Sequence, residues 1–398
     1  MNKPMRFGAM LFPINPLGQS PTVALEKDLE LIEWMDRWGF DEAWVGEHHS
    51  GGFELVGSPE LFLAFAAERT KHIRLGTGVL SVPYHNPFTT AERMVLLDHL
   101  SRGRVMFGFG PGQLASDARM LGIDPGEQRR MMREGIEVIL ELLRGEGPIS
   151  KDTDWFTLRE ARLQMRPYSH PLPEMAVAAS ISPAGPRIAG ANGIGLLSIA
   201  SWHPDGFGVL RDHWDIVEEQ AALHGRVVDR TSWRMMAPVH IARTEAEARR
   251  NVRFGLGRVF EYLRHIIPLP TLTASTFDEM IDQINGLGGG VIGTPEMAVD
   301  TIGRLIEKSG GFGCYMLQGA ELANRQMTLE SYQLFAEEVA PHFQGQLEPL
   351  QASNRWLLDS PSATPGVTRW VDDTATAIRR EIEQYEEERR VLGAGEPA

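Results

Sequence analysis

The amino-acid sequence predicts an α/β protein that folds as a (β/α)8 TIM barrel. Eight short apolar segments, each expected to form a strand, alternate with longer segments in which apolar residues recur every three or four positions. Such alternation indicates a parallel sheet with helices packed against it. Eight strand–helix units in one domain favour a closed barrel over an open sheet, and 398 residues are enough for such a barrel with insertions.

The expected strands are short apolar segments. In chain order they are Phe7–Phe12, Glu42–Val45, Ile73–Ser81, Arg104–Phe109, Ala176–Ala179, Gly195–Ile199, Trp233–Ile241 and Phe312–Leu317. Their carboxyl ends meet at one face of a barrel, where the active sites of such folds lie.

A helix is expected after each strand. In the first, Leu25, Leu29 and Ile32 share one face, Thr22 is a plausible N-cap and Gly39 a plausible stop. The helices are expected at Pro21–Trp38, Pro59–Arg69, Pro87–Leu100, Glu127–Arg144, Pro183–Ala191, Gly206–His224, Glu245–Leu263 and Leu329–Ala340.

The barrel is expected over residues 1–345, with insertions at about 145–170 and 266–293. Within the first, Trp155–Leu158 and Arg162–Met165 could pair outside the barrel. The second precedes the last strand–helix unit, where a loop at the carboxyl face would serve as a lid. Residues 346–398 are expected to form a C-terminal arm with a charged helix, which would wrap a partner subunit or the same barrel, or be a solvated tail.

Composition narrows the class of protein. The chain has 39 basic and 53 acidic residues, a formal net charge of −14, which argues against nucleic-acid and anionic-membrane partners. No apolar segment has the length of a transmembrane helix, and the N-terminus lacks the apolar stretch of a signal peptide. A single cysteine, Cys314, excludes an intrachain disulfide and fits a reducing compartment, so a cytoplasmic protein is expected.

A polar triplet, Glu47-His48-His49, follows the second expected strand. Such a cluster could bind a metal, move protons or hold a cofactor. Adjacent side chains on an extended segment point in opposite directions, so His48 and His49 are not expected to share an ion, and no metal site is predicted. Imidazole titrates near neutral pH, which suits proton transfer. An ordinary core histidine is the alternative for His49.

Two further strand ends suit a phosphorylated ligand. After the fourth strand, Gly108, Gly110 and Gly112 would let a ligand approach the backbone, although such glycines also mark tight turns. After the fifth strand, Ser180-Ile181-Ser182-Pro183 opens a helix, and a helix N-terminus can bind phosphate. The alternative is that a serine caps the helix.

In order and spacing, these motifs resemble the bacterial luciferase-like family of flavin-dependent monooxygenases, over roughly residues 5–340. The matching segments are Glu47-His48-His49, Gly76-Thr77-Gly78-Val79 with Pro83-Tyr84-His85-Asn86-Pro87, Leu96-Leu97-Asp98 with Ser101-Arg102-Gly103-Arg104 and Phe107-Gly108, and Gly293-Thr294-Pro295-Glu296. Three further segments most resemble limonene 1,2-monooxygenase-like members: Gly46–Gly52, Gly57–Glu60 and Ala67–Gly78.

The resemblance implies how a flavin would bind. Gly78 and Val79 should lie beneath the isoalloxazine ring, joined by a non-proline cis peptide. Ile181 and Ser182 should offer backbone amides to the flavin phosphate, with help from the Ser180 hydroxyl.

The phosphate end carries one residue that matches the family and one that does not. Arg130 falls where luciferases have a phosphate-binding arginine; a surface helix charge is the alternative. Pro111 stands where they have a basic phosphate ligand, so another group must replace that ligand. Gly110 precedes it in the expected cofactor site.

The resemblance also implies the chemistry. His48 takes the catalytic position, His49 flanks it and Glu47 orients them. The cofactor would be reduced FMN, with FAD possible, and O2 the co-substrate, reacting through a flavin hydroperoxide. A separate reductase would supply reduced flavin, the substrate would be an apolar small molecule such as a terpene, with limonene epoxidation as the example, and the enzyme would be a homodimer. Met10, Phe12, Phe109, Trp202 and a lid over 266–292 would exclude water.

Several alternatives stay open. The barrel could bind a deazaflavin and transfer hydride, or oxygenate ketones or aldehydes in the Baeyer–Villiger manner. A flavin-binding protein without catalysis and a metal-dependent hydrolase are two further alternatives.

Overall fold

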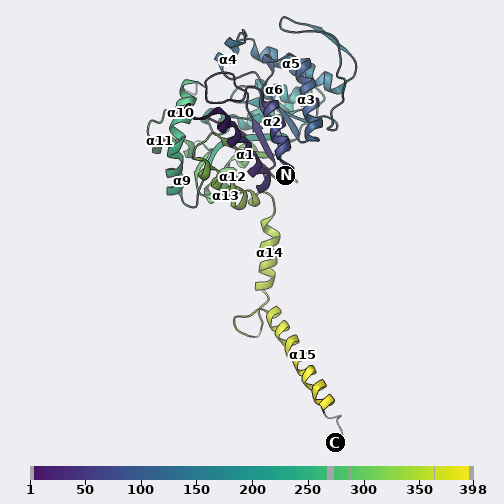
Figure 1. The fold of residues 1–398 in the computed structure, drawn as a ribbon, viewed down its shortest axis with the longest axis vertical. Coiled ribbons are helices and arrows are strands. Elements are labelled where there is room, and N and C mark those ends of the chain that lie inside the picture. The colour runs from purple at the N-terminus through teal and green to yellow at the C-terminus, as the bar shows by residue number, and fades with distance from the viewer. Residues whose placement is uncertain (1–3, 267–272, 287, 363, 394–398) are drawn as a thin grey trace. The chain divides into compact units, whose positions relative to one another are not determined.

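The computed structural model describes residues 4–266, 273–286, 288–362 and 364–393. Its contacts divide the chain into two compact units, Met1–Ala340 and Pro341–Ala398. Figure 1 shows the helices of the first unit ranged around its strands, and α14 and α15 as the two helices of the second.

Eight parallel strands close into the predicted barrel. They are β1 Arg6–Leu11, β2 Glu42–Val45, β3 Arg74–Ser81, β4 Val105–Gly110, β7 Glu174–Ala179, β8 Gly195–Ser198, β9 Trp233–Ile241 and β11 Cys314–Gly319. β1 pairs with β2 on one side and β11 on the other, and the β8–β9 pairing completes the ring. The (β/α)8 fold expected from the alternation is confirmed.

A ninth short strand, β10 Val291–Gly293, was not predicted. It pairs in parallel with the last residues of β9, from Val239 to Ile241. It lies within the expected insertion 266–293, together with helix α11 Phe277–Gly286. The rest of the expected lid includes residues 267–272 and 287, which lie outside the described residues.

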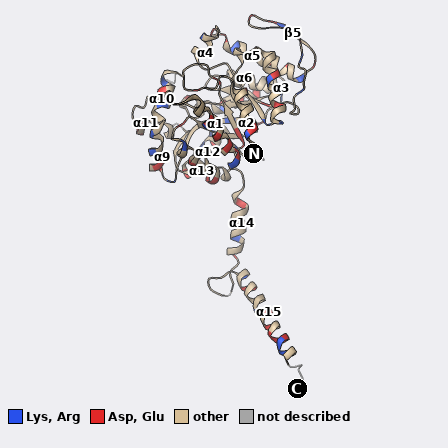
Figure 2. Cartoon of the chain, in the orientation of Figure 1, with Lys and Arg blue, Asp and Glu red and all other residues tan. Residues whose placement is uncertain are grey.

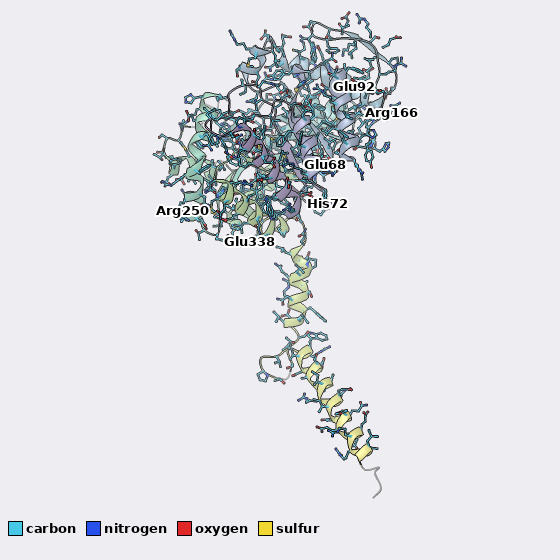
Figure 3. The ribbon with its side chains drawn as sticks, viewed as in Figure 1. Glu68, His72, Glu92, Arg166, Arg250 and Glu338 are labelled. Atoms are coloured by element: carbon cyan, nitrogen blue, oxygen red, sulfur yellow. The ribbon has the colours of Figure 1, made fainter. Side chains whose placement is uncertain are left out.

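The helices cover the outside of the barrel. Asn86 begins α3 by accepting a hydrogen bond from the Phe88 amide, and Gly39, at φ 79°, ends α1. The helices are α1 Pro21–Trp38, α2 Pro59–Arg69, α3 Pro87–Ser101, α4 Ala115–Met120, α5 Gln128–Arg144, α6 Ala184–Asn192, α7 Pro204–Gly208, α8 Leu210–Leu223, α9 Glu245–Asn251, α10 Leu256–His265, α12 Pro295–Ser309 and α13 Arg325–Glu338. Glu68 on α2 and Arg250 on α9, both labelled in Figure 3, are exposed side chains of this outer layer.

The first insertion forms an antiparallel hairpin of β5 Ile149–Asp152 and β6 Thr157–Ala161. The sequence-based pairing of Trp155–Leu158 with Arg162–Met165 was therefore wrong about the partner. The strand that pairs with β6 comes before Trp155–Leu158 in the chain and not after it.

The barrel interior is layered. At the amino-terminal end, the buried Arg234 guanidinium binds the buried Glu42 carboxylate, with Nε–Oε2 at 2.6 Å and Nη2–Oε1 at 3.0 Å. Above this pair lies an apolar layer, which includes the free thiol of Cys314. The layer consists of Met10, Trp44, Met106, Ala176, Leu197, Met236, Cys314 and Met316. The top of the barrel is left for the polar strand ends.

The second unit contains α14 Leu347–Leu358 and α15 Arg369–Gly393. No described side chain of residues 341–393 is buried. The red and blue colouring in Figure 2 marks acidic and basic residues along the later turns of α15. Within the described part of the chain, no helix is both long and apolar enough to cross a membrane.

Candidate active site

A cavity of about 340 Å3 opens at the carboxyl ends of the strands, a volume typical of small-molecule sites. Its walls come from the ends of most strands and from α5, α6 and α10. Six residues that sequence reasoning assigned to the site line it: Glu47, His48, Gly78, Val79, Ser180 and Ser182. Phe12 and Trp202 form expected apolar walls, whereas Met10 and Phe109 lie in the core below.

His48, which follows β2, lies between two buried carboxylates. Its Nδ1 is 3.3 Å from Asp117 Oδ2, and its Nε2 is 3.5 Å from Glu54 Oε1. Burial alone would lower the pKa of His48, but Glu54 and Asp117 outweigh it and raise the pKa. Because both ring nitrogens face carboxylates, the imidazolium form, with two N–H donors, suits this place.

Glu54 is held by a second partner. The Tyr262 hydroxyl, from α10, donates a short hydrogen bond to the Glu54 carboxylate, and Tyr262 itself lines the cavity. Burial raises the pKa of Glu54, which would favour its neutral form and weaken its hold on His48. We place the shared proton on His48, because Asp117 adds a second negative charge there and the pKa of Asp117 is lowered despite its burial, chiefly by the hydrogen bond with His48.

Glu47 has a separate set of partners. Its carboxylate lies 3.0 Å from His49 Nε2 and 2.7 Å from His85 Nε2, and it accepts a hydrogen bond from the Ser81 amide. These bonds outweigh burial and lower the pKa of Glu47, while the bond to Glu47 raises the pKa of His49. His49 does not line the cavity. The two adjacent histidines therefore bind different carboxylates, as expected from an extended segment.

The floor of the cavity contains the peptide bond between Gly78 and Val79. This bond is cis, as the resemblance implies. Gly110, on β4, is not a lining residue; a Cβ there would lie 2.5 Å from Val79 Cγ2. Its missing side chain makes room for Val79 and not directly for a ligand.

The polar end of the cavity lies beside α6. Ser180 and Ser182 line it, and neither hydroxyl has a hydrogen bond with another described residue. The Ile181 side chain is exposed and its carbonyl accepts a hydrogen bond from His213. Unpartnered hydroxyls just before a helix are suited to an anionic group.

The expected phosphate-binding arginine, Arg130, is not among the lining residues. Arg130 does not line the cavity, because its guanidinium is bound on the outer surface by Glu127, Glu134 and Asp154. Its neighbour Arg129 lines the cavity and forms no ion pair with a described residue. On α5, Arg129 lies three residues before Met132, which also lines the cavity, so the two share a helix face.

The residues present fit a flavin phosphate and ring. Ser180, Ser182 and Arg129 offer hydroxyl and guanidinium donors to an anionic group, and small and apolar residues form much of the remaining lining. Pro111, in place of a basic ligand, also lines the cavity, and its carbonyl accepts a hydrogen bond from Gln128. Arg129 is the one arginine or lysine among the described residues that line the cavity.

Sequence reasoning missed Asp117, Glu54 and Tyr262. Asp117 lies on α4, shortly after β4, and Glu54 lies in the loop after β2, so a wider search for acidic residues after each strand would have found them. Tyr262 left no such signal, because it occupies an ordinary position among the apolar residues of α10.

Comparison with known proteins agrees with this geometry. A family model described as luciferase-like monooxygenase matches residues 5–311. Limonene 1,2-monooxygenase of Rhodococcus erythropolis is 48% identical over 386 residues, covering 97% of each chain. 4-Hydroxyprotoasukamycin monooxygenase of Streptomyces nodosus subsp. asukaensis is 40% identical, covering 91% of this chain and 99% of the relative.

A solved structure shares the fold. The oxygenating constituent of 3,6-diketocamphane monooxygenase from Pseudomonas putida, a type II Baeyer–Villiger monooxygenase in complex with FMN, matches with a TM-score of 0.71 at 23% identity. The match covers 85% of this chain and 98% of that one. With the family model and the two relatives, it leads to one conclusion: the chain belongs to the luciferase-like monooxygenases, a family of flavin-dependent enzymes.

Proposed function

We propose that this enzyme inserts one oxygen atom of O2 into an apolar, terpene-like molecule such as limonene, with reduced FMN bound in the cavity. The observation that carries the proposal is His48, held between Asp117 and Glu54 at the edge of a cavity that has an apolar wall and an anion-compatible end. Limonene 1,2-monooxygenase as a relative over nearly the whole chain supports the substrate class.

The flavin would be held by residues of three elements. Ser180 and Ser182, before α6, and Arg129, on α5, would bind its phosphate, with the Ile181 and Ser182 amides as further donors. Val79 and its cis peptide would support the ring. FMN is proposed over FAD because the FMN complex of the camphane enzyme has the same fold.

Reduced flavin, once bound, supplies the electrons that activate dioxygen. The residues of the chain manage protons and water. The His48 imidazolium holds a proton at the cavity edge, and Asp117 and Glu54 keep it charged and oriented. Phe12, Trp202 and Leu263 exclude water from the reaction space. A proton donor at this place favours electrophilic oxygen transfer, as in epoxidation, over the nucleophilic Baeyer–Villiger path.

The proposal includes partners. A separate reductase would deliver reduced flavin. The enzyme would be a cytoplasmic homodimer; the exposed side chains Leu61 and Phe65 on α2, with Leu96 and Leu100 on the neighbouring α3, are the apolar surface that supports dimerisation.

The test is oxygen incorporation by the purified chain with chemically reduced FMN, 18O2, and limonene beside a camphane-type ketone. We expect limonene to gain one labelled oxygen atom. His48→Gln should lower the yield by about 10²–10⁴-fold, the range of a lost general acid, while FMN binding is retained. Unchanged yield in His48→Gln would remove the proton role. Anaerobic turnover with a reduced deazaflavin would favour the hydride-transfer alternative.

A further inference from the structure

We propose that α15 is a pairing helix, which forms a short antiparallel coiled coil with α15 of a second copy of this chain. The observation is a regular apolar stripe. Val371, Ile378, Tyr385 and Leu392 recur every seven residues, and Ala375 and Ile382 fall four residues after the first two of them. A 3.5-residue period is the pattern by which one helix packs along another.

The stripe is exposed within this chain. Val371, Ile378, Ile382 and Tyr385 are 53–61% exposed, and α15 has no buried residue. A helix in a protein owes most of its stability to the packing of its apolar face against other elements. A 25-residue helix whose apolar face is exposed to water therefore lacks this packing. A partner that covers the stripe would supply the missing packing.

The required partner is another long helix. The stripe runs over 22 residues from Val371 to Leu392, and its two ends are about 32 Å apart at 1.5 Å per residue. α14, with 12 residues, is too short to cover it. A second α15 has the same length and the same period, and such a self-complementary face forms a two-fold interface.

Charges beside the stripe favour the antiparallel order. In a parallel pair, Glu381 would face Glu386 of the second copy, and the two would repel each other. In an antiparallel pair that sets Ile382 against Tyr385, Arg379 lies beside Glu386 of the other helix, twice by symmetry. In this antiparallel pair Glu381 lies near Glu388 of the other helix and repels it. Each such repulsive contact is offset by one attractive Arg379–Glu386 contact, which the parallel pair lacks.

The single native cysteine makes a direct test possible. Cys314 is buried, so a cysteine introduced on α15 is the reactive thiol. In the full-length chain, Ile382→Cys and Tyr385→Cys variants should form a mixed disulfide dimer when combined under mild oxidation. We expect at least about tenfold more cross-linked product than from Glu383→Cys, whose side chain lies off the stripe. Product no greater than this control would overturn the proposal, and a predominance of unmixed dimers would overturn the antiparallel order.

A second variant tests whether the stripe drives pairing. Ile378→Lys in the two cysteine variants should abolish the mixed dimer, whereas Gln384→Lys, off the stripe, should leave it unchanged. Equal cross-linking in both would overturn the role of the stripe. Oxygen incorporation should stay at the level of the parent chain in every variant, so failure of this test is distinct from failure of the proposed function.

Discussion

At the scale of single residues, His48 shows how position changes the pKa of an ordinary side chain. Its two ring nitrogens face Asp117, on α4, and Glu54, in the loop after β2. The resemblance placed His48 at the catalytic position from the sequence alone. A search for acidic residues after each strand could have found the two carboxylates, 69 and 6 residues from His48, but only the fold shows that each one faces a ring nitrogen and that the pKa of His48 is raised.

The pH dependence of the reaction follows from this environment. The pKa of His48 is raised, so a step that needs the imidazolium is at full rate below that pKa and is lost as the pH rises through it. Glu54→Gln removes one of the carboxylates that raise the pKa, and the alkaline limb of the pH–rate profile should move to lower pH. Tyr262→Phe, which keeps the carboxylate, is the matched comparison. A limb that stays in place in Glu54→Gln would contradict the assignment.

The phosphate end gives a second prediction. Arg129→Gln should weaken FMN binding by about 10- to 100-fold, as expected for the loss of a hydrogen bond to a charged group. Riboflavin, which lacks the phosphate, should bind both proteins equally. Quenching of flavin fluorescence measures both affinities. Arg130→Gln is the control, because that guanidinium is already bound by three carboxylates; a larger loss there would restore the original assignment.

The Arg129 and Arg130 positions mark a limit of motif matching. Neighbouring residues on a helix point about 100° apart, so a shift of one residue moves a side chain from the cavity to the outer surface. The face could have been read from Met132, three residues after Arg129, but only if that methionine was already known to line the cavity.

At the scale of elements, the alternation of apolar segments was sufficient to locate all eight barrel strands. It was insufficient for β10, whose three residues are too few to show a period and lie beside glycines. The hairpin partner was misplaced for a related reason: Ile149–Asp152 has one buried residue and gives no alternating pattern. Strands that are very short or bury few side chains show no clear apolar periodicity in the sequence.

The contact between β3 and β4 gives an element-scale prediction. Gly110→Ala places a Cβ 2.5 Å from Val79 Cγ2, so the strand ends must shift. We expect a loss of about 1–3 kcal/mol in the free energy of unfolding, as for overpacked cores, measured from denaturant midpoints. Gly18→Ala, in open space, is the control. Adding Val79→Ala should recover part of the loss; if it recovers none, the contact is not the cause.

At the scale of the whole molecule, an apolar layer inside the barrel separates two layers of polar residues. His48, Asp117 and Glu54 lie near the carboxyl ends of the strands, and a buried ion pair, Glu42 with Arg234, lies at the amino ends. The sequence placed Glu42 at a strand start but gave no sign of its partner, since β2 and β9 are far apart in the chain and meet across the interior. Closure of the barrel is what joins them.

This pair gives the final prediction. Arg234 and Glu42 are fully buried, and Arg6 and Trp44 also bind the Glu42 carboxylate. Arg234→Met removes the central cation and leaves the negative charge of the buried Glu42 carboxylate incompletely neutralised. This change should lower the free energy of unfolding by about 3–5 kcal/mol.

The matched control is an exposed pair on the hairpin. Arg159→Met breaks its ion pair with Asp152, where both side chains are about two-thirds exposed, and surface pairs contribute about 0–1 kcal/mol. Adding Glu42→Gln to Arg234→Met should recover part of the loss, because the unpaired charge is then gone. Unfolding midpoints in urea separate the cases. An Arg234→Met protein as stable as Arg159→Met would mean that the apolar layer, and not the ion pair beneath it, holds the barrel closed.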